Sequence, residues 1–254
     1  MTDSKQRISF KPLKWYKELS SSKGRLNSNA FIVEGEHAIR QIISNFPDQI
    51  LELVSTTPLS SPYRSIPVRQ VKEGQFHAIS TAKTPRGIIA VVRLPVETYQ
   101  DTLPDKIGDK IVLLEDIQDP GNVGTLIRSA AAFNFAGILL TDKSADPFSP
   151  KCIQSTAGSI LSVWIRRTKN YLNLVNTLKQ KDYTVFTTEV NGDQPPSALR
   201  QATKIILALG NESQGISDQL LKIADHRLGI PINRNKAQSL NVAASGAIFM
   251  FESC

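Results

Sequence analysis

Cysteine is scarce in this chain of 254 residues, which contains only Cys152 and Cys254. Two cysteines are too few for the disulfide framework of a small secreted domain, and no Cys/His group has the spacing of a zinc site. Long hydrophobic runs are missing too, since no apolar stretch approaches the roughly 18 residues that a transmembrane helix needs. The first residues, Met1-Thr2-Asp3-Ser4-Lys5, are polar, so we do not expect a secretory signal. We therefore expect a cytoplasmic protein with no membrane partner and no bound metal.

Acidic residues are outnumbered, with 30 Lys and Arg against 23 Asp and Glu, which gives a net charge of +7. Apolar residues make up 41% and charged residues 21%, which is typical of a globular protein and argues against extensive disorder. A basic surplus favours a polyanionic partner such as nucleic acid, although ordinary cytosolic proteins reach this value as well. Residues 1–108 hold 15 basic and 10 acidic residues, whereas residues 109–254 hold 15 and 13. Most of the surplus therefore lies in the first part of the chain.

Two domains are expected, 1–108 and 109–254, joined by a linker at about 94–108 that contains Pro95, Pro104 and several acids but no apolar periodicity. The first domain has one helical pattern followed by three strand-like runs, which are 35–45, 50–55, 66–71 and 87–93. This is the composition of a small α/β domain.

The second domain alternates short apolar runs with helical patterns. The runs that predict strands are 111–115, 137–141, 184–188 and 205–209, and the helical patterns lie around 123–130, 171–181 and 241–251. Such alternation predicts βαβ units, and hence a mostly parallel sheet with helices on both faces.

In a sheet of this kind ligands bind at the carboxyl ends of the strands, so the turns after the strands are where function is expected. The first such turn, 119–128, has Gly121 and Gly124 three residues apart, which does not match the G-x-G-x-x-G pattern of a dinucleotide site. A simple structural interpretation is that Asn122 caps a helix and that Arg128 is a surface residue.

Two further turns, 208–216 and 229–243, carry unusual polar residues. Glu212 follows Gly210 and Asn211, where glycine would let a ligand approach the backbone, although an exposed loop carboxylate is the plainer alternative. Ser239 or Asn241 would cap the last helix, after the polar loop Asn233-Arg234-Asn235-Lys236 with its two cations.

Taken together, the three turns resemble the motifs of the SpoU/TrmH family of RNA ribose 2′-O-methyltransferases, within the SPOUT or α/β-knot superfamily. The resemblance covers 109–254 and rests on segments that share residue type and spacing with the family, which are Asn122-x-Gly124-x-x-x-Arg128, Asp146–Lys151, Gly210-Asn211-Glu212-x-x-Gly215-Ile216, Ile230-Pro231 and Ser239-Leu240-Asn241-Val242-Ala243. More weakly, 1–94 is similar, through Phe31–Gly35, to the substrate-binding domain of many members, which resembles a ribosomal RNA-binding protein.

The resemblance implies a C-terminal trefoil knot, an obligate homodimer whose active site draws on both subunits, and S-adenosyl-L-methionine as the methyl donor. It implies a catalytic Arg128 acting at the ribose, arranged by Asn122, Glu212, Ser239 and Asn241. The methyl-donor pocket that it implies is lined by Gly210, Ile230 and Leu240, with Leu209 and Thr188. Three departures concern the third motif. Ile232, Asn233 and Arg234 stand where relatives usually have a glycine, and the interval from Ile230 to Ser239 is one residue longer. Ala243 stands where relatives often have a serine.

Arg128 has two possible roles. It could be a general base, if the positive charge of the methyl donor favours loss of the guanidinium proton. It could instead be a fixed cation that stabilises the forming alkoxide and binds a phosphate, which suits the normally charged state of a guanidinium.

The N-terminal segment offers cations for RNA. The basic residues there are Lys5, Arg7, Lys11, Lys14, Lys17, Lys23 and Arg25, with Trp15 and Tyr16 among them. Phosphate contacts through Lys14, Lys23, Arg25 and Arg128, with aromatic stacking, would suit RNA, while an ordinary solvated helix face is the alternative.

The sequence therefore predicts an S-adenosylmethionine-dependent RNA 2′-O-methyltransferase, with 23S rRNA favoured over tRNA because of the N-terminal domain. A catalytically silent RNA-binding or ribosome-assembly factor of the same fold is the alternative from another class, and a dehydrogenase is disfavoured by the glycine pattern.

Overall fold

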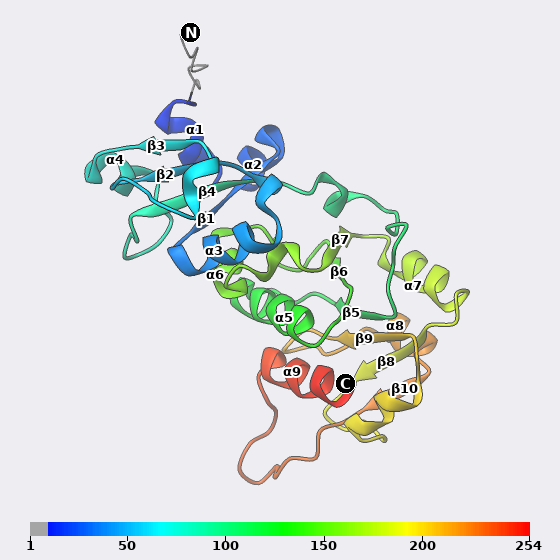
Figure 1. The fold of residues 1–254 in the computed structure, drawn as a ribbon. Helices are drawn as coiled ribbons and strands as arrows, with labels where there is room; N and C mark the ends of the chain where they lie inside the picture. Colours follow the sequence, from blue (N-terminus) through cyan, green and yellow to red (C-terminus); the bar gives the residue numbers. More distant parts are fainter. Residues whose placement is uncertain (1–9) are drawn as a thin grey trace. The chain divides into compact units, whose positions relative to one another are not determined.

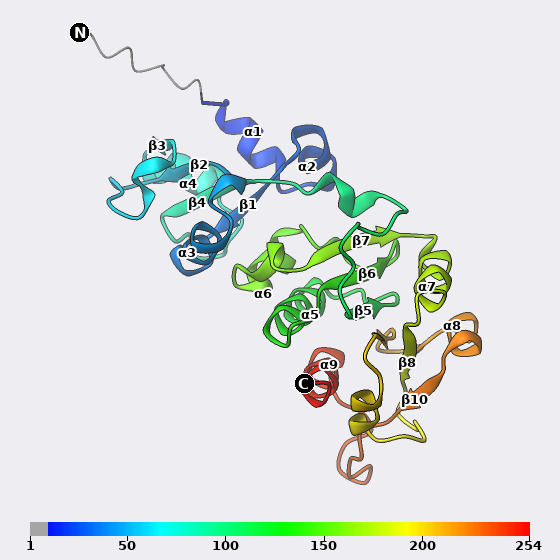
Figure 2. The ribbon, with the colours of Figure 1, turned by 45° about the vertical axis from the view of Figure 1, so that its right-hand side comes forward.

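The computed structural model describes residues 10–254, which divide into two compact units. The first comprises the chain up to Pro95 together with Phe148–Pro150, and the second comprises Val96–Pro147 and Lys151–Cys254. Figures 1 and 2 show both units.

The first unit is built on a mixed sheet of order β1-β4-β2-β3. Its strands are β1 (Ala30–Glu34), β2 (Ile50–Ser55), β3 (Val68–Gln70) and β4 (Ile88–Arg93). β4 runs antiparallel to β1 and β2, whereas β2 and β3 are parallel. Its helices are α1 (Leu13–Glu18), α2 (Ser22–Ser28), α3 (Glu36–Asn45) and α4 (Glu73–Ile79).

The core of the first unit joins helices and sheet through large buried side chains. Tyr16 from α1 and Phe76 from α4 pack with Ile32, Ile89 and Val91 from the strands. Tyr16 is fully buried, and its burial raises the pKa of the phenol to about 12.

The second unit is built on a six-stranded sheet of order β10-β8-β9-β5-β6-β7, in which every pairing is parallel. Its strands are β5 (Lys110–Leu114), β6 (Gly137–Thr141), β7 (Trp164–Thr168), β8 (Thr184–Thr188), β9 (Ile205–Leu209) and β10 (His226–Leu228). The strands β6 and β9 are buried along their whole length and are apolar except for Thr141, as expected for a parallel sheet covered on both faces.

Helices cover both faces of this sheet (Figures 1 and 2). They are α5 (Pro120–Ala132), α6 (Pro150–Thr156), α7 (Tyr171–Lys179), α8 (Asp218–Ile223) and α9 (Val242–Glu252). Leu174 and Val175 of α7 and Leu220 of α8 pack on one face. On the other face α9 lies against α5 and β9 at Gly246, where an added Cβ would be 2.3 Å from Leu126 and 2.8 Å from Leu209.

The predicted α/β class is confirmed, as is the parallel C-terminal sheet with helices on both faces. The strands predicted at 50–55, 137–141, 184–188 and 205–209 have the observed bounds. Three strands were not among the predicted runs, namely β1, β7 and β10, and β5 begins and ends one residue earlier than the predicted 111–115. β7 was not predicted because Arg166 and Arg167 interrupt its apolar pattern.

The segment expected to be a linker packs on the second unit. Trp164 Nε1 donates to the carbonyl of Ile107 at 2.8 Å, and Arg166 Nε donates to that of Thr102 at 2.7 Å. Arg166 is only 6% exposed, and its buried guanidinium finds the partners that it requires in the carbonyls of Thr102 and Ile165.

Within residues 10–254, no helix has the length and apolar character needed to cross a membrane.

Candidate active site

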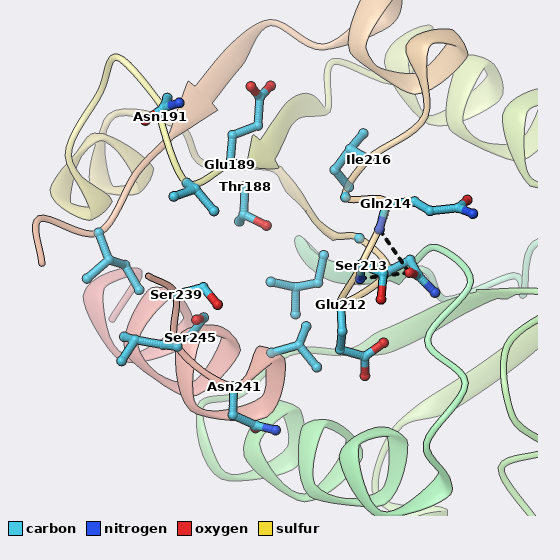
Figure 3. Close-up of a pocket in the computed structure, with 18 of the residues that line it drawn as sticks. Thr188, Glu189, Asn191, Glu212, Ser213, Gln214, Ile216, Ser239, Asn241 and Ser245 are labelled. Atoms are coloured by element: carbon cyan, nitrogen blue, oxygen red, sulfur yellow. Dashed lines mark hydrogen bonds between the residues drawn. The ribbon is translucent and has the colours of Figure 1, made fainter. Parts of the chain in front are cut away.

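The three unusual turns of the sequence meet at one edge of the parallel sheet. β5 and β9 are paired in register, Leu114 opposite Leu209, so their carboxyl ends lie side by side. A cavity of about 740 Å³ opens there (Figure 3). Its wall is formed by the segments that follow β8, β9 and β10 and by the start of α9. Ligand sites in open α/β sheets occupy this place.

Asn122 links two side chains that come from the other two turns. Its Nδ2 donates to Glu212 Oε1 at 2.8 Å, and its Oδ1 accepts from Asn241 Nδ2 at 3.1 Å. We call Asn122, Glu212 and Asn241 the polar triad. Glu212 and Asn241 line the cavity (Figure 3).

Helix caps hold the triad in place. The interpretation of Asn122 as a cap is wrong, because Asp119 is the N-cap of α5 and its Oδ1 accepts from Asn122 N at 3.0 Å. Asn241 does cap α9, as predicted, with Oδ1 accepting from Ala243 N at 2.9 Å and Ala244 N at 3.3 Å. The caps leave the Asn122 side chain and the Asn241 amide nitrogen free to join the triad.

Lys151 supports the same helix start from α6. Its ammonium lies 2.5 Å from Asp119 Oδ2, and this bond lowers the pKa of the Asp119 carboxyl group.

The Glu212 loop is closed by its own backbone. Asn211 and Gly215 exchange two backbone hydrogen bonds, at 3.1 and 2.9 Å, and Gly215 has a φ of +71°. A Cβ on Gly210 would lie 2.4 Å from the carbonyl carbon of Gly215. The close packing of this loop therefore requires a glycine at position 210, whether or not a ligand approaches the backbone there.

A buried carboxylate anchors the far end of this loop. Glu115, 4% exposed, accepts from Ser217 N at 2.8 Å and Oγ at 2.6 Å and from the Tyr171 hydroxyl at 2.5 Å. Burial and this bond to Glu115 raise the pKa of Tyr171 to about 12. Glu115 was not singled out from the sequence, because it merely ends an apolar run.

The residues predicted to line a methyl-donor pocket all border the cavity, together with the predicted Ser239. These residues are Thr188, Leu209, Gly210, Ile230 and Leu240. The structure adds others that sequence reasoning missed, among them Glu189, Val190, Asn191, Ile232 and Ser245. Position was their only signal, since most of them follow the end of β8 or β10 directly.

Arg128 lies outside this cavity. It is exposed on α5, two turns after Asn122, on the same side as Gly121 and Thr125, while Val123, Leu126 and Ile127 face the core as predicted. Arg128 has no hydrogen bond or ion pair to another residue of the described chain, so its guanidinium is available to a partner from outside.

A family profile and a relative decide the identity of this fold. The profile of the SpoU rRNA Methylase family matches residues 109–251. The 23S rRNA (guanosine(2553)-2′-O)-methyltransferase RlmP of Bacillus subtilis is 31% identical over 241 residues, which cover 94% of this chain and 94% of the relative. The chain belongs to the SpoU rRNA methylase family. The resemblance inferred from the three turns is thereby confirmed, and with it the prediction of an RNA ribose 2′-O-methyltransferase.

Solved structures of similar proteins extend over both units of this SpoU methylase. The AdoMet-bound rRNA methyltransferase of Sinorhizobium meliloti has a TM-score of 0.79 at 25% identity and covers 100% of this chain and 96% of its own. The SpoU methyltransferase AviRb of Streptomyces viridochromogenes, solved with AdoMet, has a TM-score of 0.80 with 95% and 96% coverage. Its identity is 22%, so the likeness to AviRb concerns the fold alone.

The cations predicted to bind RNA in the first unit of this SpoU methylase differ in accessibility. Lys14 is 87% exposed at its side chain, 3.9 Å from the Glu18 carboxylate, and Lys23 is exposed as well. Arg25 differs from the prediction: it is 2% exposed, because Nη1 donates to the carbonyls of Leu19 and Ser20 at the turn between α1 and α2. The role of Arg25 is structural.

The aromatic pair of this segment divides in the same way. Tyr16 is buried in the core and is not a stacking platform, whereas Trp15 is half-buried. Lys5 and Arg7 lie outside the described residues.

Cys152 is buried on α6, as predicted, and desolvation raises the pKa of its thiol. Among residues 10–254, no group of three or more His, Cys, Asp or Glu side chains is placed to hold a metal ion.

Proposed function

We propose that this SpoU methylase transfers the methyl group of S-adenosyl-L-methionine to a ribose 2′-hydroxyl of 23S rRNA. The observation that carries the proposal is the polar triad at the rim of a cavity of about 740 Å³, at the sheet edge where the three motifs converge. The names of the relatives support the choice of RNA, since RlmP of Bacillus subtilis and a Streptomyces viridochromogenes enzyme that is 26% identical over 175 residues are both 23S rRNA 2′-O-methyltransferases.

The chain's own residues fit a nucleoside-like methyl donor. The cavity has the size of a small-molecule site, and apolar side chains of Leu209, Ile230 and Leu240 border it beside the hydroxyls of Thr188 and Ser239. When bound, S-adenosylmethionine supplies an electrophilic methyl group on a sulfonium. The residues of the cavity bind it, orient it and exclude water.

We assign Arg128 the role of a fixed cation. A guanidinium stays protonated at any working pH, so it suits the stabilisation of a forming alkoxide and the grip on a neighbouring phosphate better than proton removal. Its exposure on α5 is consistent with contact to a large anionic substrate.

Glu212 is then the candidate general base that accepts the proton of the ribose 2′-hydroxyl. Asn122 holds Oε1, so the carboxylate keeps one orientation at the cavity rim and its second oxygen can accept the 2′-hydroxyl proton. Asn241 and Asp119 act as positioning residues, because they hold Asn122.

We further propose that two copies of the chain associate through α9 and α5. α9 is apolar on almost every side, and a helix of that kind is normally covered by protein. Its outward face nevertheless exposes Ile248 (38%) and Phe251 (59%), the latter beside Phe133, the C-cap residue of α5. Because Arg128 lies outside the cavity of its own chain, the dimer would let it serve the cavity of the second copy.

A transfer assay in solution tests the proposed function. The full chain is incubated with S-adenosylmethionine labelled in its methyl group and with 23S rRNA, 16S rRNA or tRNA from cells that lack the protein. We expect label in 23S rRNA, at one nucleotide that resists alkaline cleavage on its 3′ side. Label in tRNA alone would overturn the substrate, and no label in any RNA would favour the catalytically silent alternative.

A further inference from the structure

The loop between β10 and α9 departs from the family pattern, and the structure gives its unusual residues a definite set of contacts. Lys236 N and Ala237 N donate to the carbonyl of Asn233 at 3.0 and 3.1 Å, and Asn235 N donates to Asn233 Oδ1 at 3.1 Å. Asn233 thus fixes a compact turn that presents Arg234.

Arg234 reaches from this turn to the segment that follows β8. Its Nη1 donates to Asn191 Oδ1 and its Nη2 to the carbonyl of Val190. We call this two-point contact the Arg234 clasp. A planar guanidinium can hold two acceptors of one neighbouring segment in a fixed geometry, which a lysine cannot.

The same two segments are already joined at their base. Glu189 N donates to the carbonyl of Leu228 at 2.9 Å, and Gly229 N donates to that of Gln194 at 2.9 Å. The backbones cross so closely that a Cβ on Gly192 would lie 2.1 Å from the carbonyl carbon of Leu228. The base is therefore rigid, and the clasp is a second connection further along both segments.

The clasp joins the two segments where they line the cavity. Glu189, Val190 and Asn191 border it from one segment, and Ile230 and Ile232 border it from the other. Figure 3 shows Glu189 and Asn191 on the side of the cavity opposite Ser239 and Asn241. Val190 is 53% exposed, and its carbonyl accepts one of the two bonds of the clasp.

We propose that Arg234 is a positioning residue for the methyl donor: by clasping the segment after β8 to the segment after β10, it holds that wall of the cavity closed and slows escape of the bound nucleoside. This inference rests on the proposed function, because it concerns the ligand of the same cavity. Without the clasp, the two segments stay joined at their base, through the backbone bonds of Glu189 and Gly229, and the wall opens more often.

Ligand dissociation measured by stopped-flow fluorescence or surface plasmon resonance tests the proposal. We expect Arg234→Ala to raise the dissociation rate constants of S-adenosylmethionine and S-adenosylhomocysteine by about tenfold, the loss expected for a charge-assisted bond at an exposed site. Arg234→Lys should be nearly as defective. Asn191→Ala should have a smaller effect, and adding it to Arg234→Ala should change little further.

The two ligands separate the clasp from simple charge effects. S-adenosylmethionine carries a sulfonium and S-adenosylhomocysteine does not, so loss of a nearby cation alone would strengthen binding of the first and leave the second unchanged. Lys236→Ala is the matched control, because it removes an exposed cation of the same loop. The single-turnover rate constant at saturating methyl donor should stay within twofold in Arg234→Ala.

Two results would overturn the inference. The first is that Arg234→Ala dissociates from both ligands at rates within twofold of the wild type. The second is that Lys236→Ala changes these rates as much as Arg234→Ala does. Failure of the wild-type protein to bind either ligand would instead contradict the proposed function.

Discussion

Asn122, at the start of α5, connects the side chains of the other two members of the polar triad. Its backbone is held by the cap residue Asp119, and its side chain joins Glu212 and Asn241 into the polar triad. Asn122 fixes the orientation of the Glu212 carboxylate, and Asn241 fixes that of Asn122. A base must be held in this way to accept a proton from a positioned hydroxyl.

Replacing the triad carboxylate tests this directly. Glu212→Gln keeps an oxygen for the Asn122 bond but removes the proton acceptor, so we expect the single-turnover rate constant to fall about 100-fold or more, with methyl-donor affinity nearly unchanged. Rapid-quench methylation of 23S rRNA gives the rate. Asp218→Asn, at an exposed carboxylate six residues further on, is the control. A rate within threefold of the wild type would exclude Glu212 as the base.

Asp119 gives a prediction on stability and pH. Because its pKa is lowered in the folded protein, its contribution is present above the unfolded pKa of about 4 and is lost as pH falls through the lower folded value. Asp119→Ala should therefore destabilise the protein by about 1 kcal/mol at pH 7, the usual loss for an N-cap, and by less near pH 3. Thermal melts at both pH values measure this difference, and an equal loss at both would contradict the ionised cap.

At the residue scale, the sequence could predict several of the residues that line the cavity but not what holds them. Glu212 stands in a short motif after β9, and Ser239 and Asn241 stand in a short motif at the start of α9. Glu115, Lys151 and Arg234 act through contacts with residues more than 30 positions away, and no local pattern reveals such partners. Arg25 shows the opposite error, since a basic residue in a basic segment was assigned to RNA although it is buried.

The first helix of the second unit shows how a motif glycine serves packing between elements. α5 and α6 approach so closely at Gly124 that an added Cβ would lie 2.3 Å from the backbone oxygen of Cys152 and 2.6 Å from Ser155 Cβ. This approach places Lys151 of α6 beside Asp119, at the start of the triad's helix.

Gly124→Ala should force these two helices apart. Because the nearest atom belongs to the backbone, we expect a loss of about 1–3 kcal/mol in the free energy of unfolding, visible in urea or thermal denaturation. Gly74→Ala is the matched control: its added methyl group meets no atom within 4 Å, so it should be neutral or stabilising. Equal behaviour of both variants would show that the α5–α6 approach is not tight.

Elements with a continuous pattern could be predicted from the sequence, whereas elements defined by their neighbours could not. The strands β6 and β9 are buried along their whole length, and only Thr141 at the end of β6 is polar, so their bounds follow from a continuous apolar run. β10 has three residues and lies at the edge of the sheet, where it pairs with β8. The trefoil knot implied by the resemblance depends on how the C-terminal loops pass one another and stays a prediction.

At the scale of the whole molecule, the proposed dimer is needed for the proposed methyl transfer. If Arg128 of one copy serves the cavity of the other, two inactive variants can complement each other. Arg128→Ala and Glu212→Gln, coexpressed and purified as a mixture, should recover about a quarter of wild-type activity, because half of the dimers are mixed and each has one intact site. Each variant alone should be nearly inactive. No recovery in a mixture shown to contain mixed dimers would place Arg128 and Glu212 in one chain's site.

The basic surplus of the first 108 residues belongs to the same picture. Exposed lysines such as Lys14 and Lys23 suit phosphate contacts, which position an RNA without reading its sequence, while the second unit supplies the reaction.

Mass-spectrometric mapping of ribose methylation in total RNA, from cells with and without this protein, tests the central claim most directly. We predict the loss of one 2′-O-methyl group from 23S rRNA without the protein, restored by the wild-type chain and not by Glu212→Gln. An unchanged methylation map in both rRNA and tRNA would contradict the account.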